Sequence, residues 1–483
     1  MMSISMKNKT VVFLVIFAIT IGYQLVLAHS LTPLGIFEGD DSLVFKQMGL
    51  AMLQGKVPYV DLFDHKGPII YFIDAFCQWL ISGRWGLFLF FCLNIAAVTY
   101  VWWLIASLLI KSWGVVWPIA VSLCSYMVVL SDGNLSEEWS LLPISYCLYV
   151  FVRHFVEDRE ITPRAFFLIG LSLGLVTFIR INNAVAPCCA ILVYTVYHLY
   201  KKTTVTTTGL LKSFLMMFFG WVVVVTACCL LIWGLYGSEG LEAMIYGTFT
   251  FNFEYMGAPE AVAMDRKKVY LFYGLTTMVI LALLLLKRKV TTLSVLIVLC
   301  YVGSFVAIGS KGWGNYFIIF APVTVVATAY LYDVINRWQK ALVFLLFFLI
   351  IPLKFYQSCL GFHQDEEFYN AADEVIRKMP EEEQNRIWNA GYFNALAVLH
   401  RNGLTQANSV MIYFQLLISE RLMSSEKERF ESQPPAWIMT SVPFEKAMPL
   451  ALDSVRVTHD YVLDTVVGKD MWRQVYFYKR INK

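Results

Sequence analysis

Long apolar runs recur along this chain as far as residue 357, and they exclude most soluble folds. A helix needs roughly 20 apolar residues to cross the hydrocarbon core of a bilayer, and about eleven runs approach that length. They lie near residues 10–28, 85–110, 115–131, 139–153, 165–180, 184–200, 214–236, 269–286, 291–309, 316–335 and 341–357. Charged residues make up 15% of the chain, against roughly 25% in soluble proteins. The sequence therefore predicts a mainly α-helical, polytopic membrane protein.

The charges between the runs predict an orientation. Lys and Arg collect in cytoplasmic loops, and an N-terminus inside puts runs such as Lys287-Arg288-Lys289 there. An odd number of spans then leaves the segment after residue 357 on the outer side. The first run follows Lys7 and Lys9, as a signal peptide would, but it is long and "VLAHS" is a poor cleavage site. We expect an uncleaved anchor. The net charge of +3 gives no reason to expect nucleic acid as a partner.

The composition changes near residue 357. "FHQDEEFYNAADEVIRKMPEEEQNR" is charged with apolar residues at helical spacing, and "PPAWIMTSV" and "WRQVYFYKR" are typical of strands. We therefore expect two domains, a transmembrane domain over residues 1–357 and a small extracytoplasmic α/β domain over residues 358–483. The first outer loop, residues 29–84, holds two short stretches, 42–54 and 68–82, that suit helices lying in the membrane interface.

Ionisable and amide residues on the predicted outer side gather in four places. These are Asp40 to Lys66, Asp132 to Glu138, Arg180 with Asn182 and Asn183, and Lys311 to Tyr316. Each lies at the outer end of a predicted helix or helix pair. We therefore expect them to meet in one outward-facing cavity beside lipid.

The adjacent Asp40 and Asp41 are the strongest candidates for chemistry. Either can act as a helix N-cap, but a cap explains only one of two neighbouring aspartates. Two carboxylates can also supply a general base or metal ligands. Asp61 and Asp64 are equally well explained as loop surface, and His65 alone is usually a satisfied or solvated histidine. Lys66 precedes an apolar helix, where a cation suits a lipid phosphate, although a lysine that snorkels to the interface is the alternative.

The other clusters add carboxylates and cations. Ser136 can cap a helix whose first turn carries Glu137 and Glu138. Arg180 ends an apolar run, which is expensive unless it meets an anion or water. Lys311 lies in a glycine-rich turn before Asn315 and Tyr316. Chemistry on a lipid-linked phosphate needs this combination, with a carboxylate as base and cations or a metal for the leaving phosphate.

Four short motifs together resemble the GT-C class of membrane glycosyltransferases, which use polyprenyl-phosphate sugars. The similar families are the bacterial protein O-mannosyltransferase-like and aminoarabinose transferase-like enzymes. After Asp40-Asp41 the chain has "GKVPY" (55–59) and "HKGP" (65–68), and "NLSEEWSLLP" (134–143), "FIRINN" (178–183) and "GNYFIIFAP" (314–322) match later family segments. Asn315 stands where the family usually has His, and His65 stands where some relatives have Glu.

The resemblance implies an inverting transfer of a monosaccharide from a polyprenyl-phosphate donor to an acceptor hydroxyl at the outer face of a bacterial inner membrane. The acceptor is a glycan, lipid or protein. The catalytic base is Asp41, by its spacing to Phe45, or Asp40, by its spacing to Gly55. The donor phosphate meets Lys66, Arg180 and Lys311. The substrate or acceptor site takes in Glu137, Glu138, His65, Tyr59, Asn182, Asn315 and Tyr316.

Metal dependence and two competing functions stay open. Asp40, Asp41 and Glu137 are suited to a divalent cation such as Mg²⁺ or Mn²⁺. A lipid-linked oligosaccharide polymerase or ligase differs only in its donor. A transporter or flippase places ionisable groups near the bilayer midplane, whereas here the predicted spans are nearly free of charge. That distribution favours an enzyme.

Overall fold

The structure is a computed structural model. It describes residues 6–35, 39–128, 133–201, 207–257, 274, 277–278, 280–281, 284, 290–308, 314–342, 345, 349, 366–444, 460–470 and 473–481. The chain forms two compact units. The first consists of Met1–Ala28, Phe88–Cys229 and Glu260–Ser358, and the second of His29–Leu87, Leu230–Pro259 and Cys359–Lys483. The first outer loop therefore packs with the C-terminal segment in one unit. The domain boundary expected at residue 357 lies outside the described residues and stays a prediction.

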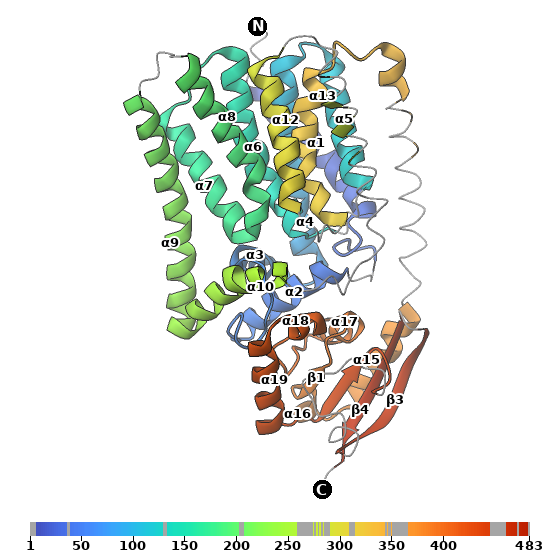
Figure 1. Ribbon diagram of the computed structural model, residues 1–483. Coiled ribbons are helices and arrows are strands. Elements are labelled where there is room, and N and C mark those ends of the chain that lie inside the picture. Colours follow the sequence, from blue (N-terminus) through green and yellow to red (C-terminus); the bar gives the residue numbers. More distant parts are fainter. Residues whose placement is uncertain are drawn as a thin grey trace. The chain divides into compact units, whose positions relative to one another are not determined.

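The first unit is a bundle of apolar helices (Figure 1). Its helices are α1 (Met6–Leu27), α4 (Arg84–Leu109), α5 (Val116–Val128), α6 (Ser136–Glu157), α7 (Pro163–Arg180), α8 (Val185–Lys201), α12 (Thr292–Ile308) and α13 (Ala321–Tyr330). Five stretches of the described residues are long and apolar enough to cross a membrane: Lys9–Leu27, Arg84–Leu109, Ser136–Glu157, Pro163–Tyr200 and Thr207–Gly257. This confirms the predicted mainly helical, polytopic architecture. The runs expected at 269–286 and 341–357 lie mostly outside the described residues.

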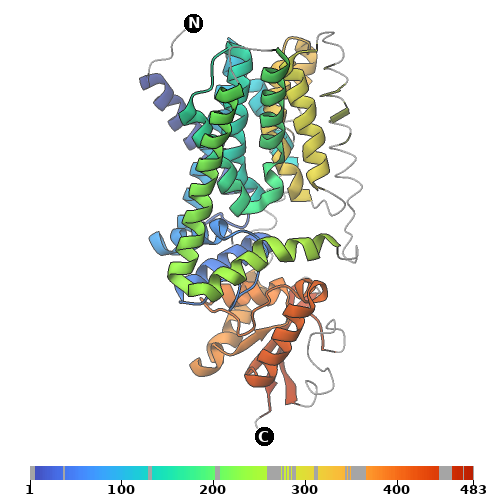
Figure 2. The same cartoon turned by 60° about the vertical axis from the view of Figure 1, so that its left-hand side comes forward.

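Helices α7 and α9 (Thr207–Ile245) pack closely because small residues lie between them. A Cβ atom on Gly170 would overlap the Met217 carbonyl, and one on Gly220 would overlap the Phe167 carbonyl. Without a hydrophobic driving force in lipid, such close backbone contact is a main source of helix association. Helix α9 extends beyond the expected run and bends at Gly237, whose φ of 71° suits glycine (Figure 2).

The second unit holds the helices of the first outer loop, α2 (Asp40–Leu53) and α3 (Pro68–Leu80), with the π-helix η3 (Tyr246–Thr250) and α10 (Phe251–Gly257). Helices α2 and α3 lie against each other at Gly49, where a Cβ would lie 2.7 Å from the Ala75 backbone nitrogen. The C-terminal part contributes α15 (Glu366–Lys378), α16 (Glu381–Gln384), α17 (Phe393–Arg401), α18 (Tyr413–Ile418) and α19 (Glu420–Ser432).

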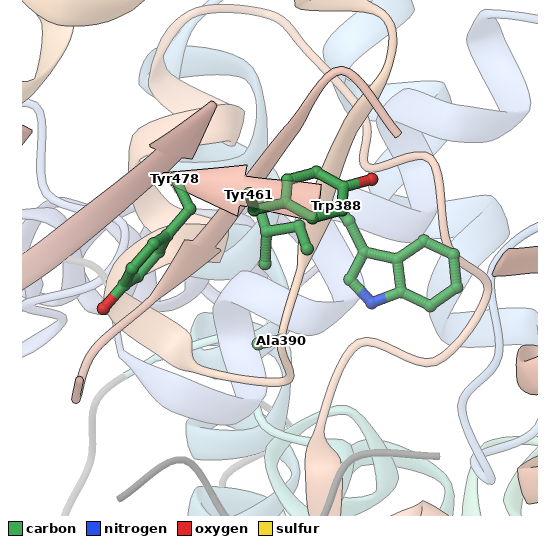
Figure 3. Packing of buried hydrophobic residues seen from close by; sticks show 5 residues of the cluster. Trp388, Ala390, Tyr461 and Tyr478 are labelled. Carbon is green, nitrogen blue, oxygen red and sulfur yellow. The ribbon is translucent and has the colours of Figure 1, made fainter. Parts of the chain in front are cut away.

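A four-stranded sheet completes the second unit, in the order β1-β2-β4-β3. Its strands are β1 (Ile387–Asn389), β2 (Trp437–Thr440), β3 (Tyr461–Asp470) and β4 (Arg473–Arg480). Strand β1 pairs with β2 in parallel and the other pairs are antiparallel, with Ile438 opposite Tyr478. Trp388, Tyr461 and Tyr478 pack around Ala390 and Ile438 (Figure 3). The two strands predicted from the sequence are β2 and β4.

Hydrogen bonds tie the first outer loop to the C-terminal segment. The buried Gln47 on α2 donates to the Leu404 carbonyl at 2.8 Å and contacts His400 Nδ1 at 3.1 Å. The Phe63 amide donates to the Ser409 carbonyl at 2.8 Å. Phe63 also forms an isolated parallel β-bridge with Val410. The loop is therefore held over much of its length by backbone and side-chain bonds to residues far along the chain.

Candidate functional site

Three consecutive ionisable residues of the first outer loop are buried together before α3. Asp64, His65 and Lys66 are 1%, 7% and 8% exposed. Together with Tyr71 on α3 and Gln415 on α18 they form what we term the Lys66 cluster. All five lie in the second unit. The alternative that Asp64 is loop surface is therefore wrong, because the C-terminal segment covers this part of the loop.

The Asp64 carboxylate is fully engaged. Its Oδ2 accepts from the Tyr71 hydroxyl at 2.8 Å, and its Oδ1 accepts from Gln415 Nε2 and pairs with His65 Nδ1, both at 3.2 Å. Burial alone would raise the pKa of Asp64, but the nearby Lys66 charge and the bonded His65 hold it well below its usual range. Asp64 is therefore an ionised acceptor at neutral pH.

His65 lies between this carboxylate and Lys66. Its Nε2 is 3.1 Å from Lys66 Nζ. Because the ionised Asp64 can only accept, the proton of His65 belongs on Nδ1, and Nε2 accepts from the lysine. Lys66 Nζ also lies 6.0 Å from the centre of the Phe45 ring on α2. Its two other N–H donors have no acceptor among the described residues.

Tyr59 is a buried support for this loop. It adopts a left-handed backbone conformation with a φ of 68°, and its hydroxyl donates to the Lys66 carbonyl at 2.9 Å. Gly247 lies against its ring, since a Cβ there would be 2.6 Å from Tyr59 Cδ1. Asn252 on α10 donates to the His65 carbonyl at 2.8 Å. The backbone around Lys66 is thus fixed from several sides.

The two candidate base residues occupy the first two positions of α2. The N-cap is Gly39, which has no side chain to make a capping bond, so the alternative that Asp41 is only an N-cap is wrong. Asp41 is half-buried. It lies one helical turn before Phe45 and therefore on the same face of α2. Phe45 lies on that face, and its ring is the one beside the Lys66 ammonium.

A second group of predicted site residues lies in the first unit and consists of the ion pair of Glu137 and Arg180 with the Tyr316 ring. Glu137 is fully buried at the start of α6, and Arg180 ends α7. Arg180 Nη1 donates to Glu137 Oε1, and Ser136 Oγ donates to Glu137 Oε2 at 3.0 Å. The Arg180 guanidinium lies over the Tyr316 ring, 3.8 Å from its centre. Tyr316 belongs to the 3₁₀ helix η5 (Gly314–Phe320).

Glu138 holds the first turn of α6 together. Its Oε2 accepts from the Leu135 amide at 2.8 Å, and its Oε1 accepts from the Tyr126 hydroxyl. The N-cap is therefore Leu135, and the expectation that Ser136 caps this helix is wrong. Ser136 lies one residue inside the helix, where its hydroxyl reaches Glu137 instead.

The remaining predicted site residues differ in how far they are exposed, and two of them lie outside the described residues. Asn182 is exposed on the 3₁₀ helix η2 (Ile181–Ala184), whereas Asn183 is buried and donates to Ser140 Oγ at 2.9 Å. Asn315 is half-buried in η5. Lys311 and Asp132 lie outside the described residues.

The described residues near Glu137 do not fit a metal ion. Both carboxylate oxygens of Glu137 already accept bonds, one from Arg180 and one from Ser136. A cation there would have to displace the arginine. Within the described part of the chain, no three His, Cys, Asp or Glu side chains come together. A metal bound through Asp40 and Asp41 stays a prediction.

Sequence reasoning missed three members of the Lys66 cluster. Asp64 carried a signal, because it directly precedes His65 and Lys66 before the Gly-Pro start of α3. Tyr71 follows at helical spacing from Gly67 but resembles any aromatic residue in an apolar helix. Gln415 gave no signal, because 351 residues separate it from Asp64.

Comparisons with solved structures reveal the fold. ArnT from Cupriavidus metallidurans bound to undecaprenyl phosphate matches with a TM-score of 0.59 and 11% identity, over 98% of each chain. Its apo form matches with a TM-score of 0.60 and 12% identity, over 97% of each chain. The oligosaccharyltransferase AglB from Archaeoglobus fulgidus, with an inhibitory peptide and a dolichol-phosphate, matches with a TM-score of 0.55 and 11% identity, over 95% of this chain and 74% of AglB.

A further crystal structure of the Archaeoglobus oligosaccharyltransferase contains Zn and sulfate. No protein-family model and no curated protein matches the sequence. At 11% to 12% identity the structural similarity shows the fold alone. The chain therefore has a GT-C-like fold, which confirms the predicted fold class.

Proposed function

We propose that this protein transfers a monosaccharide from a polyprenyl-phosphate donor to an acceptor hydroxyl, with inversion, at the outer face of a membrane. The observation that carries the proposal is the Lys66 ammonium. It is nearly buried, it is held by a neutral ring nitrogen, and among the described residues two of its donors have no acceptor. A phosphate supplies the oxygens that such a cation requires. A GT-C-like fold and structures of similar fold with polyprenyl or dolichyl phosphate support the same donor class.

The reaction that we propose balances without a cofactor. The acceptor hydroxyl attacks the sugar C1 from the face opposite the phosphate and gives its proton to an aspartate. The bond between C1 and the phosphate oxygen breaks, and its electron pair stays on the polyprenyl phosphate. Lys66 stabilises the negative charge that develops on this leaving group. A fixed cation stabilises such a charge more strongly in a water-poor site than in water.

We favour Asp41 as the base over Asp40. Asp41 shares a helix face with Phe45, whose ring lies beside Lys66. A base on the Phe45 face is on the same side of α2 as the cation that meets the leaving group.

The role of Arg180, in the first unit, as a cation for the donor phosphate stays a prediction. Glu137 and the Tyr316 ring hold its guanidinium in a fixed orientation. Glu137 is then a positioning residue for Arg180 rather than a metal ligand. Glu138 supports the helix turn that carries Glu137. The acceptor is a glycan, lipid or protein, and the roles of Asn315 and Asn182 in binding it stay predictions.

The proposed location is a bacterial inner membrane, with the N-terminus in the cytoplasm. This rests on the positive residues of the predicted inner loops. Lys66 and Arg180 then lie on the outer side, where a donor of this class has its phosphate at headgroup depth. Cysteine labelling in intact cells, at an exposed position such as Glu420, tests the orientation independently of activity.

The test compares Asp41→Asn and Asp40→Asn in the full-length protein reconstituted with a cell-envelope extract as the source of both donor and acceptor. Release of polyprenyl phosphate is followed by mass spectrometry, so the sugar need not be known. We expect Asp41→Asn to lower the rate by at least about 10²-fold, as loss of a general base does. Full activity in both variants and in the double variant would contradict the assignment.

A further inference from the structure

We propose that Asp64, His65 and Gln415 form a positioning chain that aims the Lys66 ammonium, so that the C-terminal segment takes part in donor recognition. The inference rests on the proposed function, because it assumes that Lys66 meets the donor phosphate. None of these three residues needs to touch the substrate. Each acts through the next, from α18 to the loop before α3.

The last link of the chain is the bond between His65 and Lys66. A lysine side chain is a flexible stem whose ammonium can point in many directions. The bond from Nζ to His65 Nε2, at 3.1 Å, removes one donor and fixes where the other two point. The Lys66 side chain has then lost its conformational entropy before the donor binds, and binding is stronger because this loss does not occur on binding.

The middle link sets the tautomer of His65. Only a ring with its proton on Nδ1 presents a free lone pair to Lys66 at Nε2. The ionised Asp64 selects this tautomer through the 3.2 Å contact between its Oδ1 and His65 Nδ1. Asn252 fixes the His65 backbone, and the rings of Phe251 and Tyr255 lie 5.6 Å and 5.3 Å from the imidazole centre. These contacts therefore fix both the position of the imidazole and its tautomer.

The first link comes from the C-terminal segment. Gln415 is fully buried on α18, and its Nε2 donates to Asp64 Oδ1 at 3.2 Å. A second donor, the Tyr71 hydroxyl, holds the other oxygen of Asp64. Without Gln415, Asp64 keeps only one of its two fixed partners besides the imidazole. The carboxylate plane, and through it the ring, then loses a constraint.

Two substitutions of His65 separate the links. In His65→Asn the amide nitrogen takes the place of Nδ1, so the contact with Asp64 is kept and the acceptor for Lys66 is lost. In His65→Gln the amide oxygen reaches the place of Nε2, so the acceptor is kept and the contact with Asp64 is lost. Gln415→Leu removes the link to the C-terminal segment. Gln47→Leu is the matched control, because Gln47 is equally buried and also bonds the C-terminal segment, at Leu404.

The measurement is the binding of undecaprenyl phosphate and of undecaprenol to full-length protein in nanodiscs. The dissociation constant of undecaprenol divided by that of undecaprenyl phosphate reports the phosphate site, because general loss of structure weakens the binding of both lipids. We expect His65→Asn to lower this ratio about tenfold, the effect of one charge-assisted hydrogen bond. His65→Gln and Gln415→Leu should lower it less, and Gln47→Leu should leave it as in the unsubstituted protein.

Each contrary outcome has a defined meaning. If Lys66→Met abolishes the phosphate preference but His65→Asn and Gln415→Leu keep it, the positioning chain is wrong and the proposed function stands. If Lys66→Met keeps the preference as well, the phosphate does not bind at Lys66 and both proposals fail. If Gln47→Leu lowers the ratio as much as Gln415→Leu, Gln415 has no specific part and the inference fails.

Discussion

At the scale of single residues, the partners of a buried carboxylate decide in which direction its pKa moves. Asp64 and Glu426 are both 1% exposed, yet their pKa values move in opposite directions. Asp64 has a histidine and a lysine beside it, which outweigh the cost of burial. Glu426 on α19 accepts from the Ser409 amide and hydroxyl through Oε1, but its Oε2 has no partner among the described residues, so burial dominates and raises its pKa.

This difference predicts a pH-dependent stability. Because the pKa of Glu426 is higher in the folded protein, the folded state binds more protons than the unfolded state above the ordinary carboxyl pKa of about 4.3. The contribution of Glu426 to stability is therefore full below that pH and is lost as the pH rises through its folded pKa. Glu426→Gln does not titrate and keeps the acceptor for Ser409.

The melting temperature of Glu426→Gln, relative to the unsubstituted protein, should therefore rise from about pH 4.5 upward and then level off. Thermal melts of the full-length protein between pH 4.5 and 8 measure it. Glu428→Gln, on the exposed face of the same helix, controls for the loss of a negative charge. A constant difference across the whole range would contradict the burial argument.

At the scale of helices, close packing in the first unit depends on glycines where two backbones meet. Gly170 and Gly220 each face a carbonyl of the opposing helix, so neither α7 nor α9 can carry a side chain there. Gly234 lies on α9 with nothing within 4 Å of its Cβ position. Close packing therefore requires glycine at Gly220 of α9 but not at Gly234 of the same helix.

Substituting leucine at these positions tests that distinction. We expect Gly170→Leu or Gly220→Leu to destabilise the protein by about 1–3 kcal/mol or more, because the helices must move apart. Gly234→Leu should be tolerated, since it replaces a glycine with a good helix former at an open site. Fluorescence-detected size-exclusion melts of the three variants provide the comparison. Equal melting temperatures would mean that the glycine contact does not hold α7 to α9.

At the scale of the whole molecule, the sequence predicted the apolar helices and the strands β2 and β4 because both follow from local patterns. Helix ends were less well predicted: the run expected at 214–236 became α9, Thr207–Ile245, since polar residues such as Ser213 do not stop a helix. The roles of residues that depend on burial were left open. Loop surface and a site role stayed open for Asp64, and no local pattern connects it with Gln415, 351 residues away.

The same limit explains the errors at helix starts. Asp40 and Ser136 are good N-cap residues by type, but the caps are Gly39 and Leu135. In α6 the Leu135 amide donates to the Glu138 side chain, and the Ser136 hydroxyl, one residue inside the helix, donates to Glu137. Which of two adjacent residues starts a helix depends on such tertiary competition, and a sequence pattern alone does not contain it.

The central claim is that a polyprenyl-phosphate sugar binds this protein through Lys66. Its most direct test is mass spectrometry of the lipids that co-purify with the full-length protein and with Lys66→Met. We predict a polyprenyl monophosphate that carries one sugar in the unsubstituted protein, and its loss from Lys66→Met at unchanged protein yield. A lipid-linked oligosaccharide, or the same polyprenyl-phosphate sugar retained equally by both proteins, would contradict the claim.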